Sequence, residues 1–261
     1  VGVETCIVIE PKIRDAIALL QPFGSALYGK VRSISVELDK DANVFVVLKT
    51  PGVIPEKSKA KLLKELGGIF ENLVLEEKGR VSHRQGLDFV ELSLQGVDVG
   101  VRVPPGRFSQ INWGINEILI SKVVDYLSDC ATVADLYAGA GNFSLPIARD
   151  KKERVISVES DSHLSALALE SSKKEKLQLE VISKSVERFL KEGGTKQRFD
   201  GLIVDPPRSG LGKKVAATLP RANKLVLVSC ELPSAIRDIK DLEEAGWKVE
   251  RVIPFDMFPH T

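Results

Sequence analysis

Cys230 is a residue whose type and position in this sequence suggest chemistry. It follows the apolar run LVLVS, where a strand is expected to end and a helix, PSAIRD, to begin. A free cysteine in an apolar strand is usually a small buried hydrophobe. A thiol beside a helix N-terminus can instead become a nucleophile, because the positive end of the helix favours the thiolate. We therefore predict that Cys230 is a catalytic nucleophile.

An acidic loop with two prolines lies one strand before Cys230. Asp205 ends a predicted strand in VDPPRSGL (204–211), and the two prolines that follow stiffen the chain. Asp205 and Cys230 are therefore expected over the same edge of a sheet. Such a rigid acidic loop is typical of methyltransferases that hold an acceptor base beside a donor methyl group. A Pro-Pro spacer without a function is the alternative.

A glycine-rich turn in DLYAGAGNFSLPIA (135–148) follows an earlier predicted strand. Gly139 and Gly141 let a ligand approach backbone amides, and Asn142 is expected to cap the next helix. Glu159, at the end of the following strand ISVES, is placed to accept hydrogen bonds from ribose hydroxyls. The turn and Glu159 fit a dinucleotide and S-adenosylmethionine equally well. A tight turn without a ligand is the remaining alternative.

The elements that must position these residues alternate along the chain from about residue 132. Helical patterns separate six candidate strands, and this order predicts a doubly wound, mostly parallel α/β sheet with its ligands at the carboxyl ends of the strands. The candidate strands are 132–138, 154–160, 179–185, 201–207, 224–230 and 248–256. The alternating helical patterns are 142–150, 161–174, 186–193, 213–222 and 233–246.

The earlier part of the chain predicts a smaller α+β domain over residues 1–110, beside a larger domain over 111–261. We expect a helix at 10–20, a hairpin within 33–50, a basic helix at 55–70 and two strands within 87–104. A helix over 116–129 would join the two domains.

Composition limits the compartment and the partners. The formal net charge is only +1, so a nucleic acid would need a local basic patch. The three cysteines are too sparse for a disulfide framework, and no apolar run is long enough to cross a bilayer. We expect a cytoplasmic protein without a membrane segment. Basic residues on the helix at 55–70 are interpreted as solvated surface.

Five motifs together resemble the RNA uracil-C5 methyltransferases, the family that makes 5-methyluridine in tRNA and rRNA. They are FSQIN (108–112), DLYAGAGNFSLPIA, VDPPRSGL, VSC (228–230) and FDMFPHT (255–261), in the family's order. The resemblance extends from about residue 100 to the end. The earlier half is similar, more loosely, to that family's central domain, which contacts RNA.

The resemblance implies S-adenosylmethionine as the cofactor and uridine in tRNA or rRNA as the substrate. Cys230 matches the cysteine that adds to C6 of uracil and so activates C5, with Asp205 beside it. Arg208 would contact RNA phosphate. The residues that would contact the cofactor or position the base are Gln110, Tyr137, Gly139, Gly141, Asn142, Glu159, Ser185 and Asp205.

The sequence departs from the family pattern after the nucleophile, where Glu231 and Leu232 stand before Pro233. The family's proton-abstracting glutamate and last sheet strand are expected beyond Thr261, and its RNA-binding barrel before residue 1. We therefore expect a fragment that is itself inactive. Cys6 resembles the last ligand of an iron–sulfur cluster found in some members, which only the full-length protein could complete; a core cysteine is the preferred interpretation. No other metal is expected.

Two other functions stay open from the sequence. One is a catalytically inactive RNA-binding protein that keeps the methyltransferase fold. The other is an NAD-dependent oxidoreductase that uses the glycine-rich turn and Glu159. The oligomeric state, the RNA and the modified uridine are not specified by any motif.

Overall fold

The structure is a computed structural model, and it describes residues 9–27, 29–94, 99–107, 112–150 and 152–257. Two compact units divide the chain: Val1–Leu92 with Val103–Phe108, and Ser93–Arg102 with Ser109–Thr261. Residues 93–102, assigned from sequence to the first domain, thus belong to the second unit. The indole Nε1 of Trp113 donates a hydrogen bond to the carbonyl of Ser93 at 2.6 Å, which ties that segment to the second unit.

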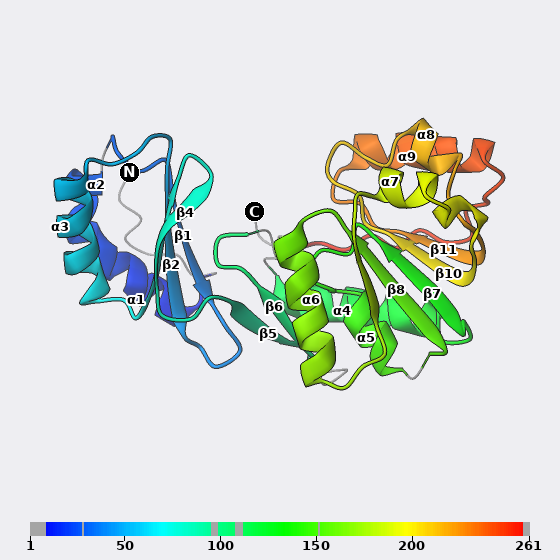
Figure 1. Cartoon of the computed structure of the whole chain (residues 1–261), viewed down its shortest axis with the longest axis horizontal. Helices are drawn as coiled ribbons and strands as arrows, with labels where there is room; N and C mark the ends of the chain where they lie inside the picture. Colours follow the sequence, from blue (N-terminus) through cyan, green and yellow to red (C-terminus); the bar gives the residue numbers. More distant parts are fainter. Residues whose placement is uncertain (1–8, 28, 95–98, 108–111, 151, 258–261) are drawn as a thin grey trace. The chain divides into compact units, whose positions relative to one another are not determined.

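The first unit is a four-stranded sheet with helices on one face (Figure 1). The strand order is β1-β2-β3-β4, and the predicted hairpin within 33–50 is confirmed as antiparallel β1 and β2. The strands are β1 (Ser33–Leu38), β2 (Val44–Thr50), β3 (Asn72–Glu77) and β4 (Arg80–Gln85). The helices are α1 (Pro11–Leu20), the 3-10 turn Gln21–Phe23, α2 (Gly24–Leu27) and α3 (Glu56–Gly67).

Alternation along the central strands builds the core of the first unit. Val46 and Leu48 of β2 share one buried cluster with Leu73 of β3, and Leu62 and Leu66 of α3 pack into the same cluster. Because side chains alternate between the faces of a strand, every second residue meets the helices. The basic helix predicted over 55–70 therefore forms as α3, with Leu62 and Leu66 on its contact face.

The second unit contains a five-stranded sheet in which all neighbours are parallel, in the order β11-β10-β7-β8-β9. This order confirms the predicted doubly wound sheet, and it reverses between β7 and β10, where ligands bind in such folds. The strands are β7 (Thr132–Leu136), β8 (Arg154–Glu159), β9 (Glu180–Ser183), β10 (Arg198–Val204) and β11 (Arg221–Leu227). The two-stranded β5 (Val90–Leu94) and β6 (Val99–Val103) form a separate ribbon.

Helices cover both faces of the parallel sheet (Figure 1). Leu136, Val158 and Val204 point to one face, where Val215 of α8 and Leu242 of α9 join their cluster. The opposite face is covered by α5 and α6. The helices are α4 (Trp113–Tyr126), α5 (Ser144–Arg149), α6 (Ser162–Lys174), α7 (Val186–Lys191), the 3-10 turn Gly194–Lys196, α8 (Lys213–Ala216) and α9 (Leu232–Glu244).

The sixth predicted strand, 248–256, was wrong. No strand forms there in the part of the chain that the structure describes, and Val252 is 72% exposed. A strand needs a neighbour that pairs with its backbone groups, and this segment has none among the described strands. The helix predicted over 213–222 is also too long, because Leu219 and Pro220 follow α8 as irregular chain and β11 already begins at Arg221.

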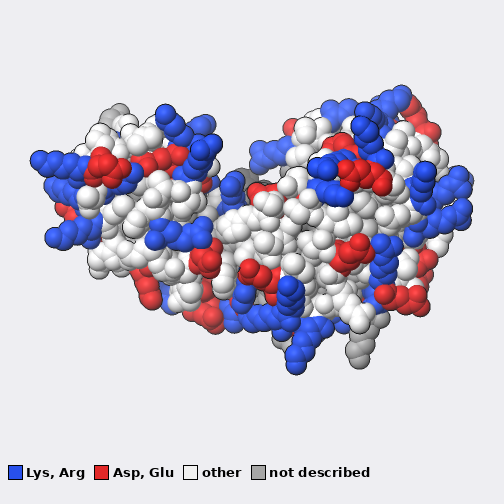
Figure 2. All heavy atoms as spheres, in the orientation of Figure 1, with Lys and Arg blue, Asp and Glu red and all other residues white. Residues whose placement is uncertain are grey.

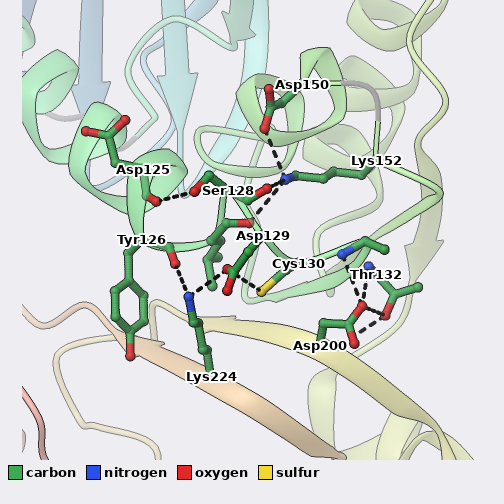
Figure 3. A network of polar contacts seen from close by, with 12 residues as sticks. Asp125, Tyr126, Ser128, Asp129, Cys130, Thr132, Asp150, Lys152, Asp200 and Lys224 are labelled. Carbon is green, nitrogen blue, oxygen red and sulfur yellow. Dashed lines mark hydrogen bonds and ion pairs between the residues drawn. The ribbon is translucent and has the colours of Figure 1, made fainter.

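A polar network fastens the amino ends of the parallel strands (Figure 3). The Asp200 carboxylate, in β10, accepts hydrogen bonds from Ala131 N at 3.1 Å, Thr132 N at 2.9 Å and Thr132 Oγ1 at 2.9 Å. In the middle of β11, Lys224 Nζ lies 2.6 Å from the carboxylate of Asp129, which precedes β7. These contacts fix where the central strands begin, at the edge opposite to Asp205 and Cys230.

Candidate active site

Backbone hydrogen bonds align the carboxyl ends of the central strands. Asp205 N donates to Leu136 O at 3.3 Å, and Val228 N donates to Val204 O at 2.9 Å. The chain leaving β10 is thus held beside β7 on one side and β11 on the other. Cys230, two residues beyond Val228, therefore leaves the sheet at the same edge as Asp205.

The glycine-rich turn after β7 uses backbone conformations that favour glycine. Gly139 and Gly141 have φ values of 57° and 95°, and Tyr137 also has a positive φ of 64°. A Cβ on Gly141 would lie 2.8 Å from Leu145 Cγ, whereas a Cβ on Gly139 would meet nothing within 4 Å. Gly141 therefore allows close packing on α5, and Gly139 borders open space.

Glu159 holds this turn through its carboxylate. Oε2 accepts a hydrogen bond from Gly139 N at 2.9 Å, and Oε1 accepts from Asp161 N at 2.7 Å and from Ser160 Oγ at 3.0 Å. The end of β8 and the glycine-rich turn are therefore linked directly. An acceptor with remaining lone pairs is kept beside Gly139.

Asn142 does not cap α5, so that prediction was wrong. The residue before the first turn of α5 is Phe143, whose side chain makes no capping hydrogen bond. Asn142 and Asn116 of α4 instead exchange two amide hydrogen bonds: Asn116 Nδ2 donates to Asn142 Oδ1 at 2.9 Å, and Asn142 Nδ2 donates to Asn116 Oδ1 at 3.1 Å. Asn116 is completely buried. The pair anchors the glycine-rich turn to α4.

Asp135 is a buried acid that none of the sequence motifs singled out. It is 0% exposed, Oδ2 accepts a hydrogen bond from Ser144 N at 3.0 Å, and Oδ1 has no partner among the described residues. Burial, reinforced by the negative charges of Asp205 and Glu159, raises the pKa of Asp135 to about 8. A charged residue within the otherwise mostly apolar strand TVADL (132–136) was the sequence feature that could have indicated this buried acid.

Asp205 carries a second carboxyl group with a raised pKa. It is half-buried, and loss of hydration raises its pKa to about 7. Pro206 behind it is buried, whereas Arg208 is exposed. The arrangement places a partly protonated acid at the strand end and a cationic side chain in solvent three residues further on.

Cys230 is a free and exposed thiol. The chain enters α9 at Leu232, and Ser234 Oγ donates to Glu231 O at 3.1 Å and to Glu231 Oε2 at 3.0 Å. The unusual Glu231-Leu232 pair is thus accommodated at the start of the helix, with Glu231 as its first flanking residue. A bulky reactant can reach the sulfur of Cys230, which a buried cysteine such as Cys130 does not allow.

Two other predicted contacts have structural partners on α7. Ser185 caps that helix by accepting a hydrogen bond from Arg188 N at 3.2 Å. Burial and the neighbouring Glu187 carboxylate raise the pKa of the Tyr137 hydroxyl. Gln110 and Cys6 lie outside the described residues.

The described residues carry charged side chains of both signs at the surface and no clustered metal ligands. No three His, Cys, Asp or Glu side chains among them are grouped so that they could hold a metal ion. None of the described helices has the length and apolar character to span a bilayer. On the face drawn in Figure 2, Lys and Arg side chains lie among acidic ones in each unit. Lys61 of α3, for example, lies 3.9 Å from Glu65.

The curated proteins that this chain resembles include RNA methyltransferases. A 23S rRNA (uracil(1939)-C(5))-methyltransferase RlmD of Acinetobacter baumannii (strain AYE) is 29% identical over 274 residues, which cover 100% of this chain and 59% of that protein. A Thermotoga maritima protein described as an uncharacterized RNA methyltransferase is 38% identical over 169 residues, covering 61% of this chain and 37% of its own. The chain thus spans about 59% of the length of the first of these relatives.

A solved structure shows the same fold. The Pyrococcus abyssi tRNA (uracil-54, C5)-methyltransferase, in complex with S-adenosyl-L-homocysteine, matches with a TM-score of 0.75 at 24% identity, over 100% of this chain and 67% of that one. The model of the tRNA (uracil-5-)-methyltransferase family matches residues 77–261. This match covers most of the chain and contains the whole glycine-rich turn, the Asp205 loop and Cys230, so the chain belongs to the tRNA (uracil-5-)-methyltransferase family.

Proposed function

We propose that the full-length protein methylates C5 of uridine in tRNA or rRNA, with S-adenosylmethionine as the methyl donor and Cys230 as a covalent nucleophile. The observation that carries the proposal is the exposed Cys230 thiol at the same sheet edge as Asp205 and the glycine-rich turn. The Acinetobacter baumannii relative is named as a uracil-C5 methyltransferase, which supports C5 of uracil as the target atom.

The residues around the glycine-rich turn fit S-adenosylmethionine. Gly139 borders open space, Glu159 has acceptor capacity beside it, and buried Asp135 keeps an unpartnered carboxyl oxygen. We assign the ribose hydroxyls to Glu159 and the approach of the ligand to the Gly139–Gly141 turn. Asp205, when ionised, would supply negative charge that favours a cationic ligand, and the unpartnered Asp135 oxygen would supply a hydrogen-bond acceptor.

Three other predicted cofactor contacts would support the site indirectly, by holding the elements around it. Asn142 would hold the glycine-rich turn in place and would not contact the cofactor itself, because the oxygen and the nitrogen of its side-chain amide already pair with Asn116. The Ser185 hydroxyl would act through α7, which it caps. Tyr137 would contribute through the strained backbone at the end of β7. Gln110 remains a predicted contact.

Uracil C5 is a poor nucleophile, and addition of the Cys230 sulfur to the ring would increase the electron density at C5. Addition of the thiolate to C6 forms an S–C6 bond and moves the electrons of the C5=C6 double bond onto C5. S-adenosylmethionine, when bound, would supply the electrophilic methyl group for C5, and the S–CH3 bond pair would stay on the sulfur of the departing S-adenosylhomocysteine. A base then takes the C5 proton, and the electrons of that C–H bond restore the double bond as the S–C6 bond breaks and Cys230 leaves as the thiolate.

The Asp205 loop would hold the uracil ring for this reaction. A base inside structured RNA must leave its stack before a thiol can reach C6. The stiff Pro206-Pro207 segment and the Asp205 carboxyl group stand at the sheet edge where that base would lie. Exposed Arg208 is placed to contact a phosphate of the displaced nucleotide.

Methyl transfer from tritiated S-adenosylmethionine tests the proposal. The full-length protein would be incubated with unmodified tRNA and rRNA transcripts, and the RNA would be digested to nucleosides. We expect tritium in 5-methyluridine, and Cys230→Ala should abolish it while Cys130→Ala, which removes a buried thiol, keeps it. Tritium in another nucleoside, or none with any transcript, would refute the proposed activity.

A further inference from the structure

The loop that carries Asp205 has no regular secondary structure, so its backbone groups need partners elsewhere. Pro206 and Pro207 have no N–H group, and within the loop Gly210 N donates a hydrogen bond to Pro207 O at 2.7 Å. The amides of Leu211 and Gly212 follow, outside any helix or strand. A buried amide without a partner is costly, so whatever satisfies these groups fixes the conformation of the loop.

Two adjacent residues of α9 supply those partners. Asp238 Oδ2 accepts a hydrogen bond from Leu211 N at 2.8 Å, and Asp238 Oδ1 accepts from Gly212 N at 3.3 Å. Arg237 Nη2 donates to Ser209 O at 2.5 Å. The Asp238 carboxylate and the Arg237 guanidinium therefore both bind the loop segment 209–212.

The contact is close as well as polar. Asp238 is 0% exposed. A Cβ on Gly210 would lie 2.7 Å from Arg237 Nη2 and 2.7 Å from Asp238 Oδ2, and Gly210 has a φ of 85°. The loop backbone thus lies directly against the α9 side chains, in a conformation that favours glycine.

The same helix begins beside Cys230. α9 starts at Leu232, and Asp238 lies in its second turn. At a rise of about 1.5 Å per residue, Leu232 and Asp238 are separated by roughly 9 Å along the helix axis. Helices are stiff over such a length, and movement of the Asp205 loop relative to Cys230 would require breaking the Asp238 bonds. One helix therefore connects the chain at Cys230 to the loop that follows the neighbouring strand β10.

We propose that Asp238, assisted by Arg237, is a positioning residue that sets the distance between the Asp205 loop and Cys230. The inference rests on the proposed function, because it assigns the loop to the uracil ring and the thiol to C6. Asp238 touches neither reactant. Its effect is on the geometry of attack, to which reaction rates are sensitive.

Asp238→Asn tests this role in the full-length protein. The amide keeps one acceptor but turns an NH2 group toward the N–H of Gly212 or Leu211, so the loop loses one bond and meets a second donor. We expect kcat for methyl transfer to fall at least about tenfold, with the KM for RNA and the Kd for S-adenosylhomocysteine changed less than about threefold. Glu243→Gln, an exposed acid on the same helix, should change none of the three.

Arg237→Met provides a second variant that should fold, because Arg237 is exposed. We expect a smaller fall in kcat in the same direction, again with S-adenosylhomocysteine affinity kept. The inference is overturned if both variants keep the wild-type kcat, or if cofactor affinity falls as much as kcat, which would indicate a general structural role. A wild-type protein that does not methylate uridine would instead refute the proposed function.

Discussion

Replacing Asp135 by Asn is predicted to flatten the dependence of the unfolding free energy on pH. Asp135 is fully buried, and desolvation, aided by the charge of Asp205, raises its pKa from 3.8 to about 8. The unfolded chain releases this proton near pH 4, whereas the native protein keeps it until about pH 8. The native state therefore holds one more proton than the unfolded chain throughout that window.

The magnitude follows from this proton difference. Each pH unit within the window lowers the unfolding free energy by about 1.4 kcal/mol for one carboxyl group. The stabilising effect of the protonated Asp135 is complete below about pH 4 and is lost as the pH rises through about 8. Between about pH 5 and 7, the wild type should lose about 3 kcal/mol more than Asp135→Asn. The Asn side chain can still accept from Ser144 N.

Urea unfolding followed by circular dichroism at three pH values measures this difference. Asp200→Asn is the matched control, because hydrogen bonds from Thr132 lower the pKa of Asp200 below its usual 3.8. That control should lower stability without changing the slope between about pH 5 and 7. Equal slopes for the wild type and Asp135→Asn would refute the assignment of a buried, protonated Asp135.

Three further substitutions test other parts of the structure. Asp200→Ala removes three hydrogen bonds and should cost about 1 to 2 kcal/mol after solvent screening, without changing S-adenosylhomocysteine affinity; calorimetry showing weaker binding would contradict a purely structural network. Asn116→Ala breaks both bonds to Asn142 and should weaken S-adenosylhomocysteine binding about tenfold by titration; unchanged binding would mean that the pair does not hold the turn. Gly210→Ala should lower the unfolding free energy by about 1 to 3 kcal/mol, and an unchanged denaturation midpoint would argue against the close contact with Asp238.

Sequence patterns predicted the parallel sheet because each strand is short, apolar and followed by a helical repeat. The same patterns placed Asp205 and Cys230 after neighbouring strands, and parallel pairing then requires a common edge. The pairing of Asn142 with Asn116 was not predictable in this way. It joins residues far apart in sequence and depends on how α4 packs against the turn.

β4 was not predicted and residues 248–256 were wrongly predicted as a strand, each for a physical reason. β4 is mostly exposed and polar, so it lacks the apolar alternation that identifies a strand, although Lys78 and Gly79, with φ of 51° and 77°, form the tight turn before it. Residues 248–256 have the opposite character, with β-branched residues but no neighbouring strand among those described. Composition indicates the preference of a segment, whereas pairing depends on the rest of the sheet.

Covalent trapping with RNA that contains 5-fluorouridine tests the central claim most directly. Fluorine at C5 cannot leave as a proton does, so the adduct between the protein and the RNA should persist in the presence of S-adenosylmethionine. We expect the full-length protein to form a complex that survives denaturation, with the nucleotide attached to the peptide containing Cys230, and Cys130→Ala to behave alike. A complex of equal yield from Cys230→Ala, or attachment at another residue, would contradict the account.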